Sequence, residues 1–251
     1  MNRTLGVVKL GGTLYWREKG TVFGTAVTPL LLGIGLPVLM HRVLDARQAT
    51  AVFHGMLAVV LAISGFMAIT VSLTARRDSL VLKRLRTTEL TDRQILAGEA
   101  ANVAFQTVLL IALITVAVPL LTGVPLPRDP LIYGVFVVAG AVVVTVLGVA
   151  WSAAVPRAEL AAPMTVPFFM LAGLAAGTFG PITELLPSWA DTVAALLPTS
   201  AVVEMARVAY APGDLAGDLA AAGRPALILA VWGVVGSAAA ARWFRWEPRR
   251  S

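Results

Sequence analysis

The residues best suited to binding chemistry gather in one charged segment, residues 75–98, which reads ARRDSLVLKRLRTTELTDRQILAG. It holds six basic and three acidic residues. Leu82 and Leu85 stand three residues apart, so they can share one face of a short helix over 80–86 with basic side chains around them. This composition suits an interface with another protein. A solvated loop would explain the basic residues equally well, but it would not explain the apolar pair.

A second local signal lies near the end of the charged segment. Thr91, with Gln94 three residues later, forms the pattern of a capping box, which predicts that a long helix begins there. Asp78 or Ser79 is a suitable cap for the short helix before it. The expected order is therefore a short amphipathic helix, a turn at 87–89 and a long helix.

Other kinds of chemistry are not indicated. The chain has no cysteine and only two histidines, His41 and His54, which argues against a thiolate or histidine-rich metal site. None of its three lysines follows a glycine, so it lacks the P-loop that binds ATP. We therefore predict no catalytic residue, no metal site and no cofactor held by this chain.

Composition places these residues in a membrane protein. Only 14% of the 251 residues are charged, against about 25% in soluble domains, and the mean hydropathy is +0.82. Six runs are long enough to cross a bilayer as helices: 21–40, 51–74, 101–121, 131–155, 161–180 and 225–241. Alternating ten-residue patterns are absent, which argues against a β-barrel. We expect an all-α, polytopic fold with six transmembrane helices, forming a single transmembrane domain over 1–251.

The basic residues predict how these spans are oriented. With both termini on one side, fifteen of the twenty Lys and Arg residues share that side with the charged segment. Loops rich in Lys and Arg face the cytoplasm, so both termini and the charged segment should be cytoplasmic. Residues 1–20 mix Trp16 with basic and apolar residues, as an interfacial helix does. The net charge of +6 follows from this bias and does not indicate nucleic-acid binding.

Several features of the predicted spans remain open. His54 is expected to be interfacial or hydrogen-bonded. The pair Gly173 and Gly177 permits close helix packing, within the chain or between subunits. Residues 181–223 are too polar to span continuously, and prolines divide them into short pieces that suit an outer or re-entrant segment. Within them, Glu204 and Arg207 are spaced for a local ion pair. The six spans contain no carboxylate, whereas ion-driven transporters usually place one there.

The run from Leu82 to Thr91, LKRLRTTELT, resembles the loop between spans two and three of ABC-2 type transporter permeases. That family commonly shows a pattern such as G-T-L-K-R-L-R-x-T-P-L-S. Here Leu80-Val81 stands in place of Gly-Thr, and Glu89 in place of proline. The layout of the whole chain is also similar. The resemblance implies a cytoplasmic coupling helix that docks on an ATPase subunit through Leu82, Lys83, Arg84, Leu85, Arg86, Thr88 and Glu89.

On this resemblance we expect a permease subunit of an ABC-2 type exporter in the bacterial cytoplasmic membrane. A separate partner subunit would bind ATP and Mg²⁺, and a second copy or a related permease would complete a dimer. Apolar spans suit a hydrophobic or amphipathic cargo such as an antibiotic or drug, with Phe168, Phe169 and Met170 facing its path. Trp243 and nearby arginines would contact membrane lipid. A lipid, glycolipid or polysaccharide exporter is the alternative, and a secondary transporter or membrane-embedded lipid enzyme is the alternative of another class.

Overall fold

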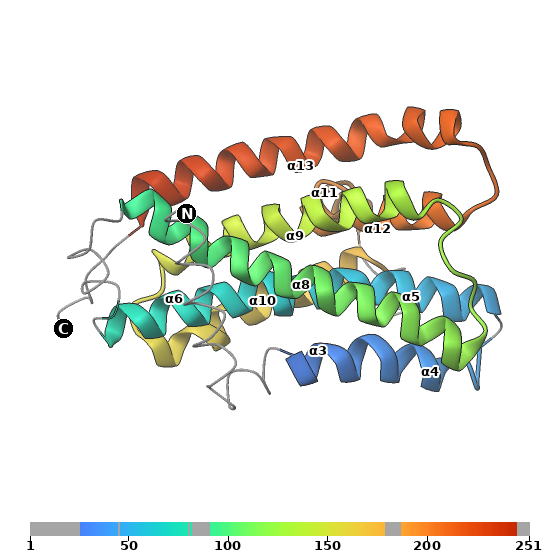
Figure 1. The fold of residues 1–251 in the computed structure, drawn as a ribbon, viewed down its shortest axis with the longest axis horizontal. Helices are drawn as coiled ribbons and strands as arrows, with labels where there is room; N and C mark the ends of the chain where they lie inside the picture. Colours follow the sequence, from blue (N-terminus) through green and yellow to red (C-terminus); the bar gives the residue numbers. More distant parts are fainter. Residues whose placement is uncertain (1–25, 45, 80, 82–90, 179–186, 245–251) are drawn as a thin grey trace, which may run out of the picture.

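The computed structural model describes residues 26–44, 46–79, 81, 91–178 and 187–244, and helices with their connections make up this part of the chain (Figure 1). Five of the described helices are long and apolar enough to cross a membrane: Gln48–Asp78, Asp92–Thr122, Pro130–Ser152, Ala158–Ala175 and Leu215–Trp243. A shorter apolar helix covers Thr28–Met40. The predicted helical membrane bundle is thus confirmed, while the count of six spans is not. The expected interfacial helix at 1–20 lies outside the described residues.

The elements follow one another as a series of helices with short connections. In chain order they are α3 (Thr28–Leu30), η2 (Leu31–Gly35), α4 (Leu36–Met40), α5 (Ala46–Leu61), η3 (Ala62–Met67), α6 (Ala68–Asp78), α8 (Asp92–Thr122), α9 (Pro130–Ser152), η4 (Ala158–Leu160), α10 (Ala161–Ala175), α11 (Ser188–Ala194), α12 (Pro198–Tyr210) and α13 (Leu215–Trp243). The end of the bundle where α6 ends and α8 begins is called here the charged-segment end. The end where α8 ends and α9 begins is called the opposite end (Figure 1).

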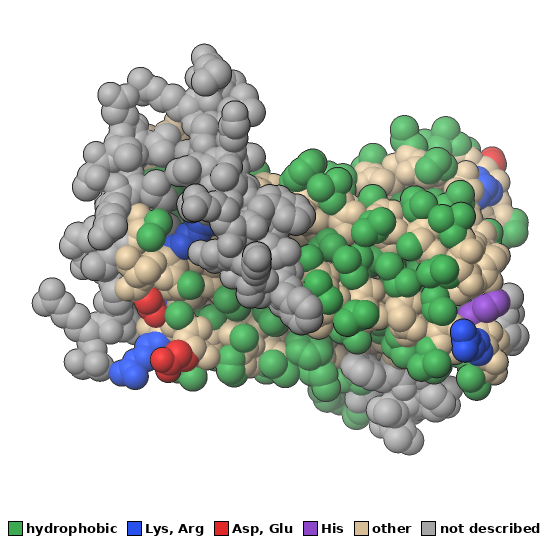
Figure 2. All heavy atoms as spheres, turned by 60° about the horizontal axis from the view of Figure 1, so that its bottom comes forward, with side chains coloured by type: hydrophobic (Ala, Val, Ile, Leu, Met, Phe, Trp, Pro, Cys, Tyr) green, Lys and Arg blue, Asp and Glu red, His purple; other side chains and the backbone are tan. Residues whose placement is uncertain are grey.

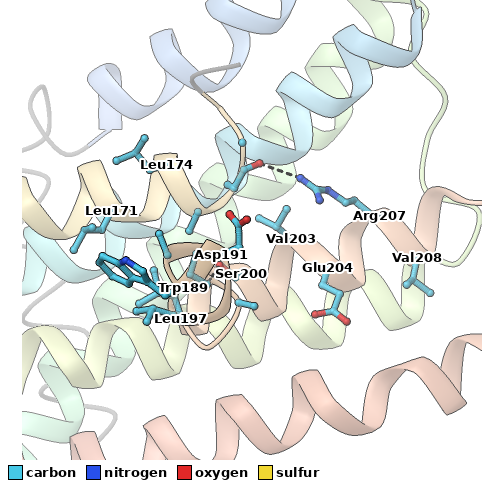
Figure 3. Close-up of a pocket in the computed structure, with 17 residues that line it drawn as sticks. Leu171, Leu174, Trp189, Asp191, Leu197, Ser200, Val203, Glu204, Arg207 and Val208 are labelled. Atoms are coloured by element: carbon cyan, nitrogen blue, oxygen red, sulfur yellow. Dashed lines mark hydrogen bonds between the residues drawn. The ribbon is translucent and has the colours of Figure 1, made fainter. Parts of the chain in front are cut away.

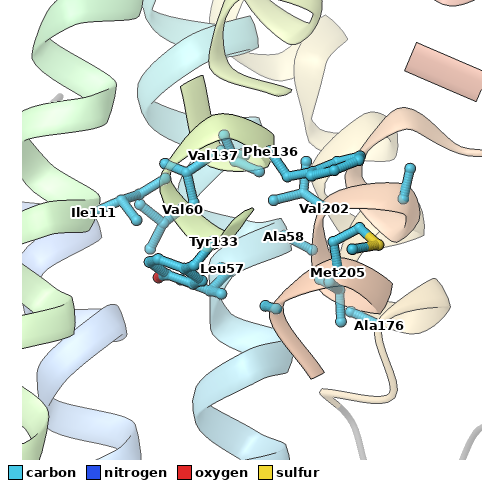
Figure 4. Close-up of a cluster of buried hydrophobic side chains, with 14 of the residues drawn as sticks. Leu57, Ala58, Val60, Ile111, Tyr133, Phe136, Val137, Ala176, Val202 and Met205 are labelled. Atoms are coloured by element: carbon cyan, nitrogen blue, oxygen red, sulfur yellow. The ribbon is translucent and has the colours of Figure 1, made fainter. Parts of the chain in front are cut away.

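The centre of the bundle is the continuous helix formed by α5, η3 and α6. In its most apolar stretch 83% of the residues are buried. Its side chains meet those of α8, α9 and α12 in one core cluster (Figure 4), which includes Leu57, Val60, Ile111, Tyr133, Phe136, Val137, Val202 and Met205. Because this helix is enclosed by its neighbours, it contacts lipid little and can link the two ends of the bundle mechanically.

Two glycines of α9 allow neighbouring helices to approach closely. A Cβ added at Gly148 would lie 2.4 Å from Ile69 Cγ2 and 2.6 Å from the backbone oxygen of Phe66. A Cβ at Gly140 would lie 2.2 Å from Val202 Cγ2. Small residues at helix crossings in membranes serve this purpose. The pair Gly173 and Gly177 does not, because Gly177 lies beyond the end of α10 with a φ of +73°, which suits a glycine that ends a helix.

The polar stretch before the last span contains two separate helices, α11 and α12. Pro187 caps α11 and Pro198 is the first residue of α12, as expected from prolines that begin helices. The turn between them lies level with the middle of α13, since Trp232 Nε1 of that helix donates to the Leu196 carbonyl at 2.7 Å. From there α12 runs toward the opposite end, where the Ala209 carbonyl accepts from Asp129 N at 3.1 Å. Residues 181–186 lie outside the described part.

The last helix is longer than its predicted span. Asp214 caps it by accepting from Gly217 N at 3.1 Å, so α13 begins at Leu215, ten residues before the expected start. Its polar first turns are held by an ion pair between Asp218 and Arg128, which precedes α9. This partner explains why a helix can start in a sequence too polar to be recognised as a span.

The surface of the bundle fits a lipid environment. Figure 2 shows hydrophobic side chains covering the flank of the molecule, with the charged side chains gathered near its two ends. Large apolar residues are widely exposed, such as Leu113, Leu120 and Leu227. A water-soluble protein rarely shows apolar patches of this extent.

Candidate functional site

The predicted docking residues themselves, Leu82, Lys83, Arg84, Leu85, Arg86, Thr88 and Glu89, lie outside the described residues, as does the turn at 87–89. The helices on both sides of them are described. On the far side the predicted capping box is confirmed: Gln94 N donates to Thr91 Oγ1 at 3.3 Å, and Thr91 N donates to Gln94 Oε1 at 2.9 Å. On the near side Ser79 is the C-cap of α6, with its N–H on the Ala75 carbonyl.

Arg77 turns into the bundle instead of facing a partner. Its side chain is 3% exposed, and it donates from Nη2 to the Val155 carbonyl at 2.7 Å and from Nη1 to the Ser152 carbonyl at 3.2 Å. Those carbonyls belong to the last turn of α9 and the residues just after it. A cation there compensates for carbonyls that have no partner within their own helix and for the negative end of the helix dipole.

The two neighbours of Arg77 make contacts to other helices. Arg76 Nη1 lies 2.5 Å from Glu99 Oε1, and the Glu99 side chain is only 3% exposed within α8. Asp78 Oδ2 accepts from the backbone N–H of Ala158 at 2.7 Å, at the start of the helical stretch that leads into α10. We call Arg76, Arg77 and Asp78 the α6 junction. Three consecutive residues thus join the end of α6 to α8, α9 and α10.

These contacts make the first residues of the charged segment part of the bundle. These residues continue α6, and their charges are satisfied inside the protein. Glu99, just before the predicted third span, is likewise buried in the bundle. The apolar runs of the sequence end before Arg76 and begin after Glu99, but the helices α6 and α8 extend beyond these runs and include the charged residues.

A second site is a cavity of about 720 Å³ between α10, α11 and α12 (Figure 3). Its walls are mainly apolar and include Leu171, Leu174, Trp189, Val193, Leu197, Val203 and Val208. Three charged residues also line it: Asp191, Glu204 and Arg207. The helix α12 is amphipathic, since Ala201, Val202, Met205, Ala206 and Ala209 face the core. The polar face of α12 lies on the other side of the helix and lines the cavity.

The expected ion pair between Glu204 and Arg207 is not formed. Arg207 Nη2 donates to the Ala176 carbonyl at 3.0 Å, which ties α12 to the end of α10. Glu204 Oε2 instead lies 3.6 Å from Arg224 Nη1 of α13, and both side chains are largely exposed. The helical spacing predicted a local pair, but groups on adjacent helices competed for both partners.

The residues expected to face the cargo lie beside this cavity and do not line it. Phe168 stacks on Phe66 with ring centroids 4.0 Å apart and an angle of 19° between the planes. Phe169 packs partly against the core, and Met170 is exposed on the flank of α10. Leu171 and Leu174, one turn further, contribute to the wall. Asp191 was missed in the sequence, although a carboxylate within an apolar, proline-divided stretch was a usable signal.

No group of His, Asp and Glu side chains suited to a metal ion occurs in the described ranges.

Comparison with protein families gives a match over most of the chain. The family model described as "ABC-2 family transporter protein" covers residues 21–242. Comparison with curated proteins and with solved structures found no match. The matched region contains the helices described above, except for the last residue of α13, together with the whole charged segment. The chain therefore belongs to the ABC-2 family of transporter proteins, as a multi-pass transmembrane subunit with a role in membrane transport.

Proposed function

We propose that this chain is the permease subunit of an ABC-2 type exporter, which moves a hydrophobic or amphipathic small molecule, such as an antibiotic or drug, out across the bacterial cytoplasmic membrane. The energy comes from ATP hydrolysis by a separate subunit, which binds ATP and Mg²⁺. The observation that carries the proposal is the α6 junction. It fastens the start of the charged segment to three helices through Arg76, Arg77 and Asp78.

The junction gives the proposed coupling a physical route. An ATPase subunit docks on residues 82–89, with Leu82 and Leu85 in an apolar pocket and Arg84 and Arg86 on acidic side chains. When the ATPase closes, it displaces this segment and with it the end of α6. Because α6 is joined to α8, α9 and the start of the stretch leading into α10 by polar contacts, among which that of Arg77 is buried, these helices move together instead of one helix sliding alone.

The orientation follows from the distribution of basic residues. The sequence predicts that fifteen of the twenty Lys and Arg residues share one side with both termini and the charged segment, and we assign that side to the cytoplasm. The segment 187–210 is then re-entrant from the outer side, since it reaches the middle of the bundle and returns along α12. Two copies, or one copy and a related permease, form the complete path. The exposed flanks of α10 and α13, whose most apolar stretches are 22% buried, leave room for that contact.

One observation favours a second candidate, a secondary transporter. Asp191 and Glu204 are carboxylates that line the cavity between α10, α11 and α12, and ion-coupled transporters use carboxylates within their membrane-spanning part. This candidate differs from the first in needing no ATPase. A lipid or glycolipid exporter remains a variant of the first candidate, with a different cargo.

The proposal is tested by reversing the charge of the docking surface. The double variant Arg84→Glu/Arg86→Glu should insert normally but lose the ATPase that co-purifies with the wild-type chain. The matched control is Arg42→Glu/Arg47→Glu, which reverses two charges at the opposite end and should retain the ATPase. A wild-type chain that purifies without any ATPase, or a docking variant that retains it fully, contradicts the proposed function.

A further inference from the structure

We propose that a water molecule is bound in the middle of the bundle, between the hydroxyl groups of Thr107 and Thr145 and beside Gly65. Thr107 belongs to α8, Thr145 to α9, and Gly65 to η3, the middle segment of the central helix. The site goes beyond the proposed function, and it is present whether or not an ATPase drives the chain.

The hydroxyl groups of these two threonines behave differently from those of other buried threonines. In four others the hydroxyl donates to the carbonyl four residues earlier in its own helix, at 2.6–2.7 Å: Thr70, Thr74, Thr115 and Thr122. The carbonyls of Val103 and Ala141 stand at the corresponding positions for Thr107 and Thr145. Yet both hydroxyls, in side chains that are 0% exposed, have no hydrogen-bond partner among the described residues. They are therefore directed toward another partner.

Both hydroxyl groups face one small space beside Gly65. A Cβ built on Gly65 would lie 3.4 Å from Thr145 Oγ1 and 3.8 Å from Thr107 Oγ1, with Val144 Cγ1 at 3.5 Å. These are ordinary van der Waals distances, so the space accepts a methyl group without displacing a neighbour. A bound water needs a space of about this size and two to four polar partners. The surroundings of Gly65 supply both.

A water molecule would satisfy both hydroxyl groups at once. Burying a hydroxyl group without a hydrogen bond is costly, and a bundle surrounded by lipid offers no solvent to relieve that cost. Each threonine hydroxyl can donate one hydrogen bond and accept others. A single water can therefore donate to one threonine and accept from the other, which joins α8 to α9 beside the central helix.

The charge of the surroundings favours water over a metal cation. The stretches that supply the site, residues 48–75, 100–127 and 130–156, contain no Asp, Glu, Lys or Arg. A sodium ion would meet hydroxyl oxygens but no countercharge, and an unpaired charge in the middle of a membrane protein is costly. Water carries no net charge and needs no such partner.

The test measures how Gly65→Ala changes unfolding in mixed micelles of increasing SDS content. The added methyl group takes the place of the water, so both hydroxyl groups lose their partner. At the wild-type midpoint, the ratio of unfolded to folded protein should rise at least about fivefold, although alanine favours a helix more than glycine does. The control is Gly134→Ala in α9, where a Cβ would have no atom within 4 Å. It should leave the ratio unchanged or lower it.

A second background separates loss of the water from simple crowding. In Thr107→Val/Thr145→Val no hydroxyl group is left to lose a partner, so adding Gly65→Ala should be neutral or stabilising. Crowding would be worse in this background, because a methyl group is larger than a hydroxyl group. The proposal is overturned if Gly65→Ala is as stable as the wild type, or if it destabilises both backgrounds by the same factor.

Two further measurements identify the ligand. The unfolding midpoint should be the same in sodium chloride and in choline chloride, and a higher midpoint in sodium alone would replace the water with a cation. A cryo-EM map of the full-length chain in nanodiscs, bound to an antibody fragment and resolved well enough to show ordered waters, should contain density between Thr107 and Thr145. Its absence from the wild-type map overturns the proposal. These experiments contain no ATPase, so failure of an ATPase to co-purify bears on the proposed function alone.

Discussion

Replacing Arg77 tests how strongly the α6 junction holds the bundle together. The guanidinium is almost fully buried and donates to two carbonyls at the end of α9, at 2.7 and 3.2 Å. In Arg77→Met both carbonyls lose their donor, while the aliphatic part of the side chain is largely kept. In Arg77→Lys the charge remains, but a single ammonium cannot reproduce the forked geometry of the guanidinium.

The expected magnitude follows from these two contacts. Hydrogen bonds that involve a charged group contribute about 1.5–3 kcal/mol each, so Arg77→Met should lower the free energy of unfolding by about 3–6 kcal/mol. Arg77→Lys should lose about half of that. The control is Arg157→Met, because Arg157 is exposed at the same end of the bundle and makes no side-chain cap there. Exposed positions of this kind change stability by less than about 0.5 kcal/mol.

The measurement is unfolding of each purified variant in mixed micelles of increasing SDS content, followed by circular dichroism. We expect the wild type and Arg157→Met to be the most stable, Arg77→Lys to be less stable, and Arg77→Met to be the least stable. A loss of less than about 1 kcal/mol in Arg77→Met would refute this expectation. The buried contacts to α9 would then contribute little, and α6 could not carry motion to that helix.

Two further predictions concern helix contacts. Gly148→Ala should destabilise the bundle by about 1–3 kcal/mol in the same unfolding assay, because the added methyl group overlaps the Phe66 carbonyl. Gly134→Ala, on the same helix, meets open space and should be neutral or stabilising. Equal effects of the two substitutions would contradict the close packing of α6 and α9. Glu99→Gln should lower the free energy of unfolding by about 2–3 kcal/mol. This is less than the 3–5 kcal/mol typical of a broken buried ion pair, because the Arg76 side chain is 18% exposed. The double variant Arg76→Met/Glu99→Leu should recover part of that loss, and a purely additive double variant would show that the two side chains do not interact.

The parts of the fold that depend on local sequence were predictable. Long apolar runs indicate spans because backbone groups in lipid must pair within a helix. The capping box at Thr91 needs only its own next three residues, and it forms as expected. Proline likewise marks the starts of α11 and α12.

The parts that depend on distant contacts were not predictable. Arg77 and its carbonyl partners are more than 70 residues apart, and nothing near Arg77 distinguishes it from the bases that follow. The start of α13 was missed for the same reason, since Asp218 is paired with Arg128 across a similar separation. Glu204 and Arg207 have the spacing of a local pair, yet each finds another partner on a neighbouring helix or turn.

The central claim, that a separate ATPase drives this chain through its charged segment, is tested most directly in liposomes of defined composition. The purified chain is reconstituted with and without the co-purified ATPase, and the movement of a labelled amphipathic drug that does not cross protein-free liposomes is followed with ATP or with an imposed proton or sodium gradient. The account predicts movement only when both subunits and ATP are present, and none with the Arg84→Glu/Arg86→Glu variant. Movement by the chain alone on an ion gradient would contradict the account and identify a secondary transporter.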